Sequence, residues 1–172
     1  MDSPIILKTS WFRLIPHLIA IVFFSYLVSL TGLYDDWIYN LIVGWAFVLL
    51  YRLIIRHTVT KDHARGIKLV KRQRFEEAVE AFHDSLTFFK QHPSLDKWRS
   101  IIFLSPGKYG YREMAYANLG FVYGQLGDGE KAMEYYNKCL ELNPKSGLAK
   151  SALNLINSTK KPEDESILKP MK

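Results

Sequence analysis

The sequence predicts an all-α protein: an N-terminal two-helix transmembrane hairpin, then a short α-solenoid of paired helices with a capping helix. Three observations carry this prediction. Two apolar runs fill most of the first 55 residues, a pattern of about 34 residues typical of paired helices ends near Pro144, and an amphipathic stretch follows it. A chain of 172 residues is long enough for one small domain and an anchor.

The first apolar run carries no charged side chain from Leu14 to Tyr34, which as a helix is long enough to cross about 30 Å of hydrocarbon. The second run is uncharged from Trp37 to Tyr51, and Arg52 can snorkel so that the next three apolar residues complete the span. A cleaved signal peptide is the alternative for the first run, but no Ala-x-Ala-like site follows it, and the second run would still anchor the chain.

Basic residues lie at the two outer ends of this predicted hairpin. Lys8 and Arg13 precede the first span, whereas the loop between the spans carries only acids. The basic residues at the end of the second span are Arg52, Arg56, Lys61 and Arg65. The positive-inside rule therefore predicts an integral membrane protein with two spans and both termini cytoplasmic, in the inner or plasma membrane if the source is bacterial.

The basic stretch after the second span also predicts contact with the lipid bilayer. The stretch from Arg52 to Arg74 contains eight Lys and Arg residues but only one acid, Asp62. Such a cluster attracts anionic headgroups. We take Arg52, Arg56, Lys61 and Arg65 as headgroup contacts, with a merely solvated helix face as the alternative. No interleaved aromatics or known motif supports nucleic acid as a partner.

Small and aromatic residues recur in a fixed order between Arg112 and Ser146. They are Tyr116, Leu119, Gly120, Tyr123, Gly127, Ala132, Tyr136, Cys139 and Pro144. Gly120 and Ala132 would lie where two antiparallel helices cross closely, and Pro144 would end the second helix. This pattern resembles the tetratricopeptide repeat family, whose repeat is a helical hairpin of about 34 residues.

A weaker copy of the same pattern precedes this repeat. Aligning Gly66 with Gly120 places Leu69, Ala78, Phe82 and Ser85 at the positions of Tyr123, Ala132, Tyr136 and Cys139. The two glycines are 54 positions apart, against about 34 for directly abutting repeats, so roughly 20 residues are inserted between the repeats.

The inserted segment carries the apolar side chains Trp98, Ile101, Ile102 and Phe103. Exposed together, they would form a patch that a soluble surface rarely tolerates. Three interpretations are open: an extra helix packed on the repeat core, insertion into the membrane interface, or contact with a partner.

The family resemblance implies that a protein partner binds in a groove formed by the first helices of the repeats. By position these groove residues would be His63, Ile67, Val70, Lys71, Ala117, Asn118, Phe121 and Gln125. Some family members bind a partner's C-terminal carboxylate with Lys, Arg and Asn at set positions. In this chain only Asn118 matches that set, so chaperone-tail capture is not expected. The mixed groove suits a helix or an extended segment.

Residues typical of catalysis are not arranged in any pattern that predicts a site. The five histidines are scattered without metal-ligand spacing, the one cysteine occupies a packing position, and no glycine-rich phosphate loop follows a strand. We therefore expect no enzyme, no catalytic or metal site, no cofactor and no small-molecule substrate.

The expected function is that of a membrane-anchored adaptor or scaffold, which binds a protein partner at the cytoplasmic membrane face, possibly in assembly of a membrane complex. The alternatives are an integral subunit of a larger complex, in which the repeats are structural, and an anionic-lipid-binding module. The predicted boundaries are a transmembrane hairpin at 1–57 (spans about 12–34 and 36–55), a helical domain at 58–158 (repeats about 59–92 and 113–146, insertion 94–112, capping helix 147–157) and a disordered tail at 159–172.

Overall fold

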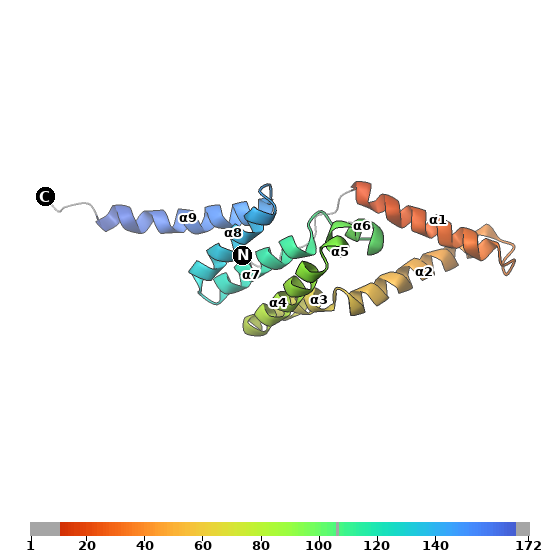
Figure 1. Ribbon diagram of the computed structural model, residues 1–172, viewed down its shortest axis with the longest axis horizontal. Coiled ribbons are helices and arrows are strands. Elements are labelled where there is room, and N and C mark those ends of the chain that lie inside the picture. The colour runs from red at the N-terminus through yellow and green to blue at the C-terminus, as the bar shows by residue number, and fades with distance from the viewer. Residues whose placement is uncertain (1–10, 106, 168–172) are drawn as a thin grey trace.

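Helices make up all of the regular secondary structure that the computed structural model describes, which covers residues 11–105 and 107–167 (Figure 1). Lys8, Pro106 and the last five residues of the predicted tail lie outside these residues. In chain order the elements are η1 (Trp11–Leu14), α1 (Ile15–Ser29), α2 (Trp37–Thr58), α3 (Lys61–Lys71), α4 (Phe75–Gln91), α5 (Pro93–Lys97), α6 (Arg99–Ile102), α7 (Tyr111–Gln125), α8 (Gly129–Leu142) and α9 (Gly147–Ile167).

Helices α1 and α2 pack side by side as a hairpin that extends away from the other helices (Figure 1). Their closest approach is at Gly44, where an added Cβ would lie 2.6 Å from the backbone nitrogen of Ser25. Phe24 and Phe47 stack across the same interface with ring centroids 6.0 Å apart. Most of the large apolar side chains of both helices face outward and are exposed, Val22 and Trp37 among them.

Helix α2 is long and apolar enough to cross a membrane, whereas α1 is apolar but has only 15 residues, about 22 Å of helix. The first apolar helix, Ile15–Ser29, is therefore shorter than the span predicted at 12–34. The hydroxyls of Ser29 and Thr31 bond to the carbonyls of Tyr26 and Val28, and Gly32 then takes a φ of +65°. These turn contacts end the helix before the apolar run ends.

The two helical hairpins α3–α4 and α7–α8 repeat one packing arrangement. A Cβ at Gly66 would lie 2.6 Å from the Phe82 ring, and a Cβ at Gly120 would lie 2.9 Å from the Tyr136 ring. Ala78 and Ala132 are buried at the same crossing, and Ser85 and Cys139 are buried two turns later. Each hairpin thus places a glycine of its first helix against an aromatic ring of its second.

Helix α7 is the centre of the helical domain, because α4 packs on one side of it and α8 on the other. One buried cluster joins α3, α4 and α7 through residues such as Leu69, Phe82 and Leu119. A second joins α7 and α8 to α9, whose Ala149 and Ala152 are buried against Cys139. Burial raises the pKa of the Cys139 thiol to about 11, so this cysteine is a protonated packing residue.

Helix α9 begins where the capping helix was predicted but continues to Ile167, through most of the segment predicted to be a disordered tail. Low apolar content led to that prediction. The segment nevertheless contains Lys and Glu, which have high helix propensity, and it extends a helix already nucleated by packing at its start.

Candidate partner-binding site

The predicted groove is partly closed in the structure. His63, Val70, Ala117 and Asn118 are buried, so they cannot contact a partner here and the prediction is corrected at these four positions. The reason is the packing of both first helices: α3 packs against α4, and α7 packs against both α4 and α8.

Four of the predicted groove residues remain accessible. Ile67 and Phe121 are half-buried, whereas Lys71 and Gln125 are exposed. These residues form two equivalent pairs, because 67 and 121, like 71 and 125, are separated by the same 54 positions as the two repeat glycines. Equivalent positions in stacked repeats lie along one face, and α3 and α7 are in contact. We name Ile67, Lys71, Phe121 and Gln125 the groove strip.

His63 is a core residue beneath this strip. Its Nδ1 lies 3.4 Å from the Ser85 hydroxyl, and its ring stands edge-on to the rings of Phe82 and Tyr111, with centroids 5.6 and 5.3 Å away. Burial lowers the pKa of His63 to about 4, although the charge of Asp96 acts in the opposite direction. The imidazole is therefore neutral at physiological pH and serves packing.

Asn118 is fully buried in the middle of α7. Neither its Oδ1 nor its Nδ2 has a hydrogen-bond partner within the described part of the chain. An unpaired buried amide costs about 1–3 kcal/mol, so this residue weakens the domain that it helps to fill. Its amide does not reach the groove strip in this structure.

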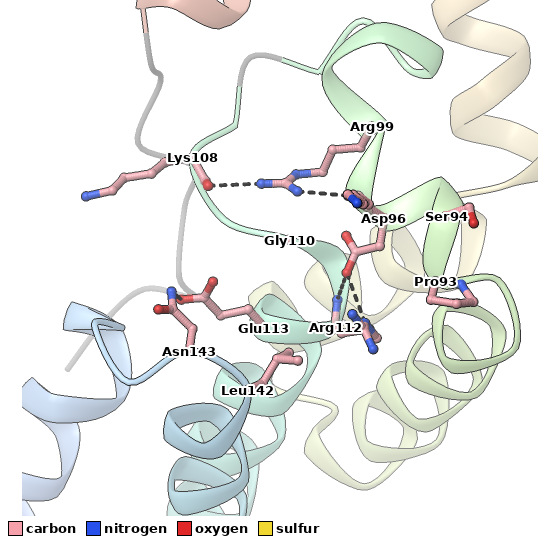
Figure 2. Close-up of a pocket in the computed structure, with 11 residues that line it drawn as sticks. Pro93, Ser94, Asp96, Arg99, Lys108, Gly110, Arg112, Glu113, Leu142 and Asn143 are labelled. Atoms are coloured by element: carbon pink, nitrogen blue, oxygen red, sulfur yellow. Dashed lines mark hydrogen bonds and ion pairs between the residues drawn. The ribbon is translucent and has the colours of Figure 1, made fainter.

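A polar hollow of about 520 Å³ lies between the insertion and the ends of α7 and α8 (Figure 2). Its centre is Asp96 of α5, whose carboxylate accepts hydrogen bonds from the backbone nitrogens of Tyr111 (2.6 Å) and Arg112 (3.2 Å) and from the Arg112 guanidinium (3.3 Å). Asp96 thereby binds the N-terminus of α7, where a negative charge is favourable. Gly110 permits this approach, since a Cβ there would lie 3.0 Å from both carboxylate oxygens.

Two further side chains make hydrogen bonds around this hollow. Arg99 donates to the carbonyl oxygens of Asp96 (2.8 Å) and Lys108 (3.0 Å), and Asn143, after α8, donates to the Glu113 carboxylate of α7 (3.1 Å). Sequence reasoning missed these residues. The available signal was a pair of opposite charges three positions apart within the insertion, Asp96 and Arg99.

The insertion does not behave as one apolar patch. Phe103 is buried against Phe89 and Tyr111, so it belongs to the core and is not available for the partner contact considered for it. Ile102 is half-buried, whereas Trp98 and Ile101 are exposed. Packing on the repeat core therefore accounts for Phe103, but it does not account for the exposed Trp98 and Ile101.

The four residues predicted to contact lipid headgroups lie around the junction between α2 and α3. Arg52 and Arg56 are on the last turns of α2, and Lys61 and Arg65 on the first turns of α3, and all four side chains are exposed. Their placement leaves them accessible to a lipid surface at that end of the hairpin.

A group of half-buried tyrosines was not predicted as a unit. Tyr123 and Tyr135 stack with centroids 5.3 Å apart, and the Tyr135 hydroxyl lies 3.2 Å from the His83 imidazole of α4. Lysine ammonium groups lie over three of the rings: Lys90 over Tyr116, Lys131 over Tyr123 and Lys138 over Tyr135. These tyrosines and lysines lie where α4, α7 and α8 meet, next to the second helices of the two hairpins, α4 and α8.

The chain is similar to known proteins of the tetratricopeptide repeat type. The family model described as "Tetratricopeptide repeat" matches residues 114–146, which confirms the repeat predicted there. Heat shock protein STI1 of Saccharomyces cerevisiae is 26% identical over 132 residues, which are 65% of this chain and 22% of that protein. No solved structure matches the chain significantly. Together, the repeat and this relative support a role in protein–protein interaction.

Proposed function

We propose that the chain is a membrane-anchored adaptor whose repeats hold a protein partner at the cytoplasmic face, during assembly of a membrane complex. The single observation that carries the proposal is the joining of two parts: a tetratricopeptide repeat at residues 114–146 and a hairpin whose apolar side chains are exposed. The proposal assigns no catalytic step and no cofactor to the chain.

The exposed apolar surface of the hairpin supports the anchor. Side chains such as Leu18, Val22, Trp37 and Ile54 are at least half exposed along both helices. A soluble protein rarely exposes a contiguous apolar surface of this extent, because hydration of apolar area is unfavourable. Lipid would cover this surface, and the acids Asp35 and Asp36 at the far turn would lie in water on the other side.

Topology reporters test the anchor. Reporters fused after Ile5 and after Lys172 are expected to read cytoplasmic, and one inserted within residues 32–36 is expected to read outside. This result follows from the basic residues at the open end of the hairpin and the acids at its turn. A C-terminus that protease removes from the outer face of intact cells would contradict the proposed orientation.

Binding at the groove strip tests the adaptor role. A partner co-purified with the full-length protein in mild detergent should be lost with the double variant Lys71→Glu, Gln125→Glu, which places two negative charges at equivalent positions of the two repeats. Both side chains are exposed, so folding should be unchanged.

The control is Lys145→Glu, which makes the same lysine-to-glutamate change as Lys71→Glu at an exposed position in the loop between α8 and α9. This variant should retain the partner. Loss of the partner with the control, or its retention with the double variant, would argue against the groove strip as the binding surface.

A further inference from the structure

The insertion lies at the open end of the α1–α2 hairpin. Helix α6 contacts α1, and the Tyr51 hydroxyl of α2 donates a hydrogen bond to the backbone carbonyl of Ile102 at the end of α6. Figure 1 shows α5 and α6 between the hairpin and the repeat helices, at the end of the hairpin opposite its turn. If the hairpin crosses a bilayer, this end is at the cytoplasmic interface.

The insertion is held firmly in this position. Phe103, Leu104 and Tyr109 are buried, and Asp96 and Arg99 bond to backbone atoms of the segments on either side. Exposed apolar residues on such a segment are not a consequence of a loose loop. They occupy a fixed place relative to the hairpin.

Two large apolar side chains of this segment are only about half covered by protein. Trp98, between α5 and α6, is 53% exposed, and Ile101 of α6 is 57% exposed, whereas Arg99 is buried. Exposed apolar area on side chains of this size is unfavourable in water. Their surroundings in the folded chain therefore indicate what covers them.

The exposed apolar hairpin lies next to this segment, because α6, which carries Ile101, contacts α1, and its last residue, Ile102, accepts a hydrogen bond from Tyr51 of α2. Cationic side chains lie on the same segment and at the same end of the hairpin. The Lys97 ammonium lies 5.9 Å from the centre of the Trp98 ring, and Arg52 and Arg56 are exposed on the last turns of α2. Indole rings with neighbouring cations are the composition found at the level of lipid headgroups.

We propose that α5–α6 is a membrane-interface element, in which Trp98 and Ile101 enter the headgroup region of the bilayer beside the hairpin. The occupant of this surface is lipid. The proposal rests on the proposed anchoring of the hairpin and deepens it. A second contact at the bilayer would prevent the repeats from rotating freely on the short α2–α3 junction and would fix the direction in which the groove strip faces.

Spin-label accessibility tests the proposal in the full-length protein. All labelled variants carry Cys139→Ser, so that a nitroxide attaches only to an introduced cysteine. Serine is chosen because the first repeat has a serine, Ser85, at the equivalent position. Labels are placed at Ile101→Cys, at Leu49→Cys on α2 as the anchor reference, and at Leu126→Cys at the end of α7 as the control on the repeats. The protein is reconstituted in nanodiscs of phosphatidylcholine and phosphatidylglycerol.

Collision with oxygen, which concentrates in lipid, is compared with collision with a water-soluble nickel chelate. We expect the oxygen-to-nickel ratio at residue 101 to lie well above that at residue 126 and below that at residue 49. A ratio at 101 equal to that at 126 would overturn the interface element while leaving the anchor intact. Low collision with both reagents at 101 would show a protein cover and would also overturn it.

The anchor reference separates this proposal from the one on which it rests. Low oxygen collision and high nickel collision at residue 49 would mean that α2 is not in lipid, which would reject the anchoring and the interface element together. A high ratio at residue 49 supports the anchoring, whatever residue 101 shows.

Discussion

Replacing Gly120 with leucine is expected to destabilise the full-length protein by about 3 kcal/mol, the upper part of the range for overpacked interfaces. A Cβ at this position would lie 2.9 Å from Cδ1, Cε1 and Cζ of Tyr136, closer than van der Waals contact allows. Tyr136 is itself 5% exposed and packs with Ala132 and Cys139, so its ring has little room to move. Urea unfolding in detergent, followed by circular dichroism, measures the loss.

Gly124→Ala is the matched control, one helical turn further along α7. A Cβ there meets only Ala132, at the ordinary distance of 3.9 Å, and the position is exposed. Because alanine has the higher helix propensity, this variant should be neutral or stabilised by up to about 1 kcal/mol. If Gly120→Leu unfolds at the same urea concentration as the unsubstituted protein, the close crossing of α7 and α8 is not where the structure places it.

The crossings at Gly66 and Gly120 show which part of the fold the sequence could predict. Each depends on a glycine and on an aromatic side chain 16 positions later, joined by a short turn, so the information is local. The same holds for the turn at Gly127, which takes a φ of +82° that glycine adopts without strain. Local spacing therefore predicted both helical hairpins with bounds close to those observed.

The groove was less predictable, because its openness depends on how the hairpins stack. Spacing alone places Ala117 and Asn118 on the first helix of a repeat. Only the three-dimensional arrangement shows that the helices packed around α7 bury both residues. The family pattern gave the positions of the groove residues, but it carried no information on which of them remain accessible.

The insertion was unpredictable for a related reason. Asp96 binds backbone nitrogens of Tyr111 and Arg112, which are 15 and 16 positions away and follow a loop of irregular conformation. No regular helix–turn–helix spacing relates these residues, because the chain between them follows an irregular loop. The length of the first span was also missed, because apolar content does not record the hydroxyl–carbonyl bonds that end α1 after Ser29.

Lowering the pH from 6.5 to 4 is expected to remove about 3 kcal/mol of stability through His63 alone. Burial lowers the pKa of this imidazole to about 4 in the folded protein, against 6.5 for an unperturbed histidine. The unfolded chain therefore binds the proton first. The contribution of neutral His63 is complete above pH 6.5 and is lost as the pH falls toward 4, at about 1.4 kcal/mol for each unit of pKa difference.

The measurement is urea unfolding between pH 7 and 4.5 for the unsubstituted protein and for His63→Gln, which keeps a polar side chain but does not titrate. Carboxylates contribute equally to both proteins, so the difference between the two profiles isolates His63. His57→Gln, at an exposed position on α2, should reproduce the unsubstituted profile. Parallel profiles for the unsubstituted protein and His63→Gln would mean that the imidazole is hydrated or charge-paired. The packing of His63 among Phe82, Ser85 and Tyr111 would then be wrong.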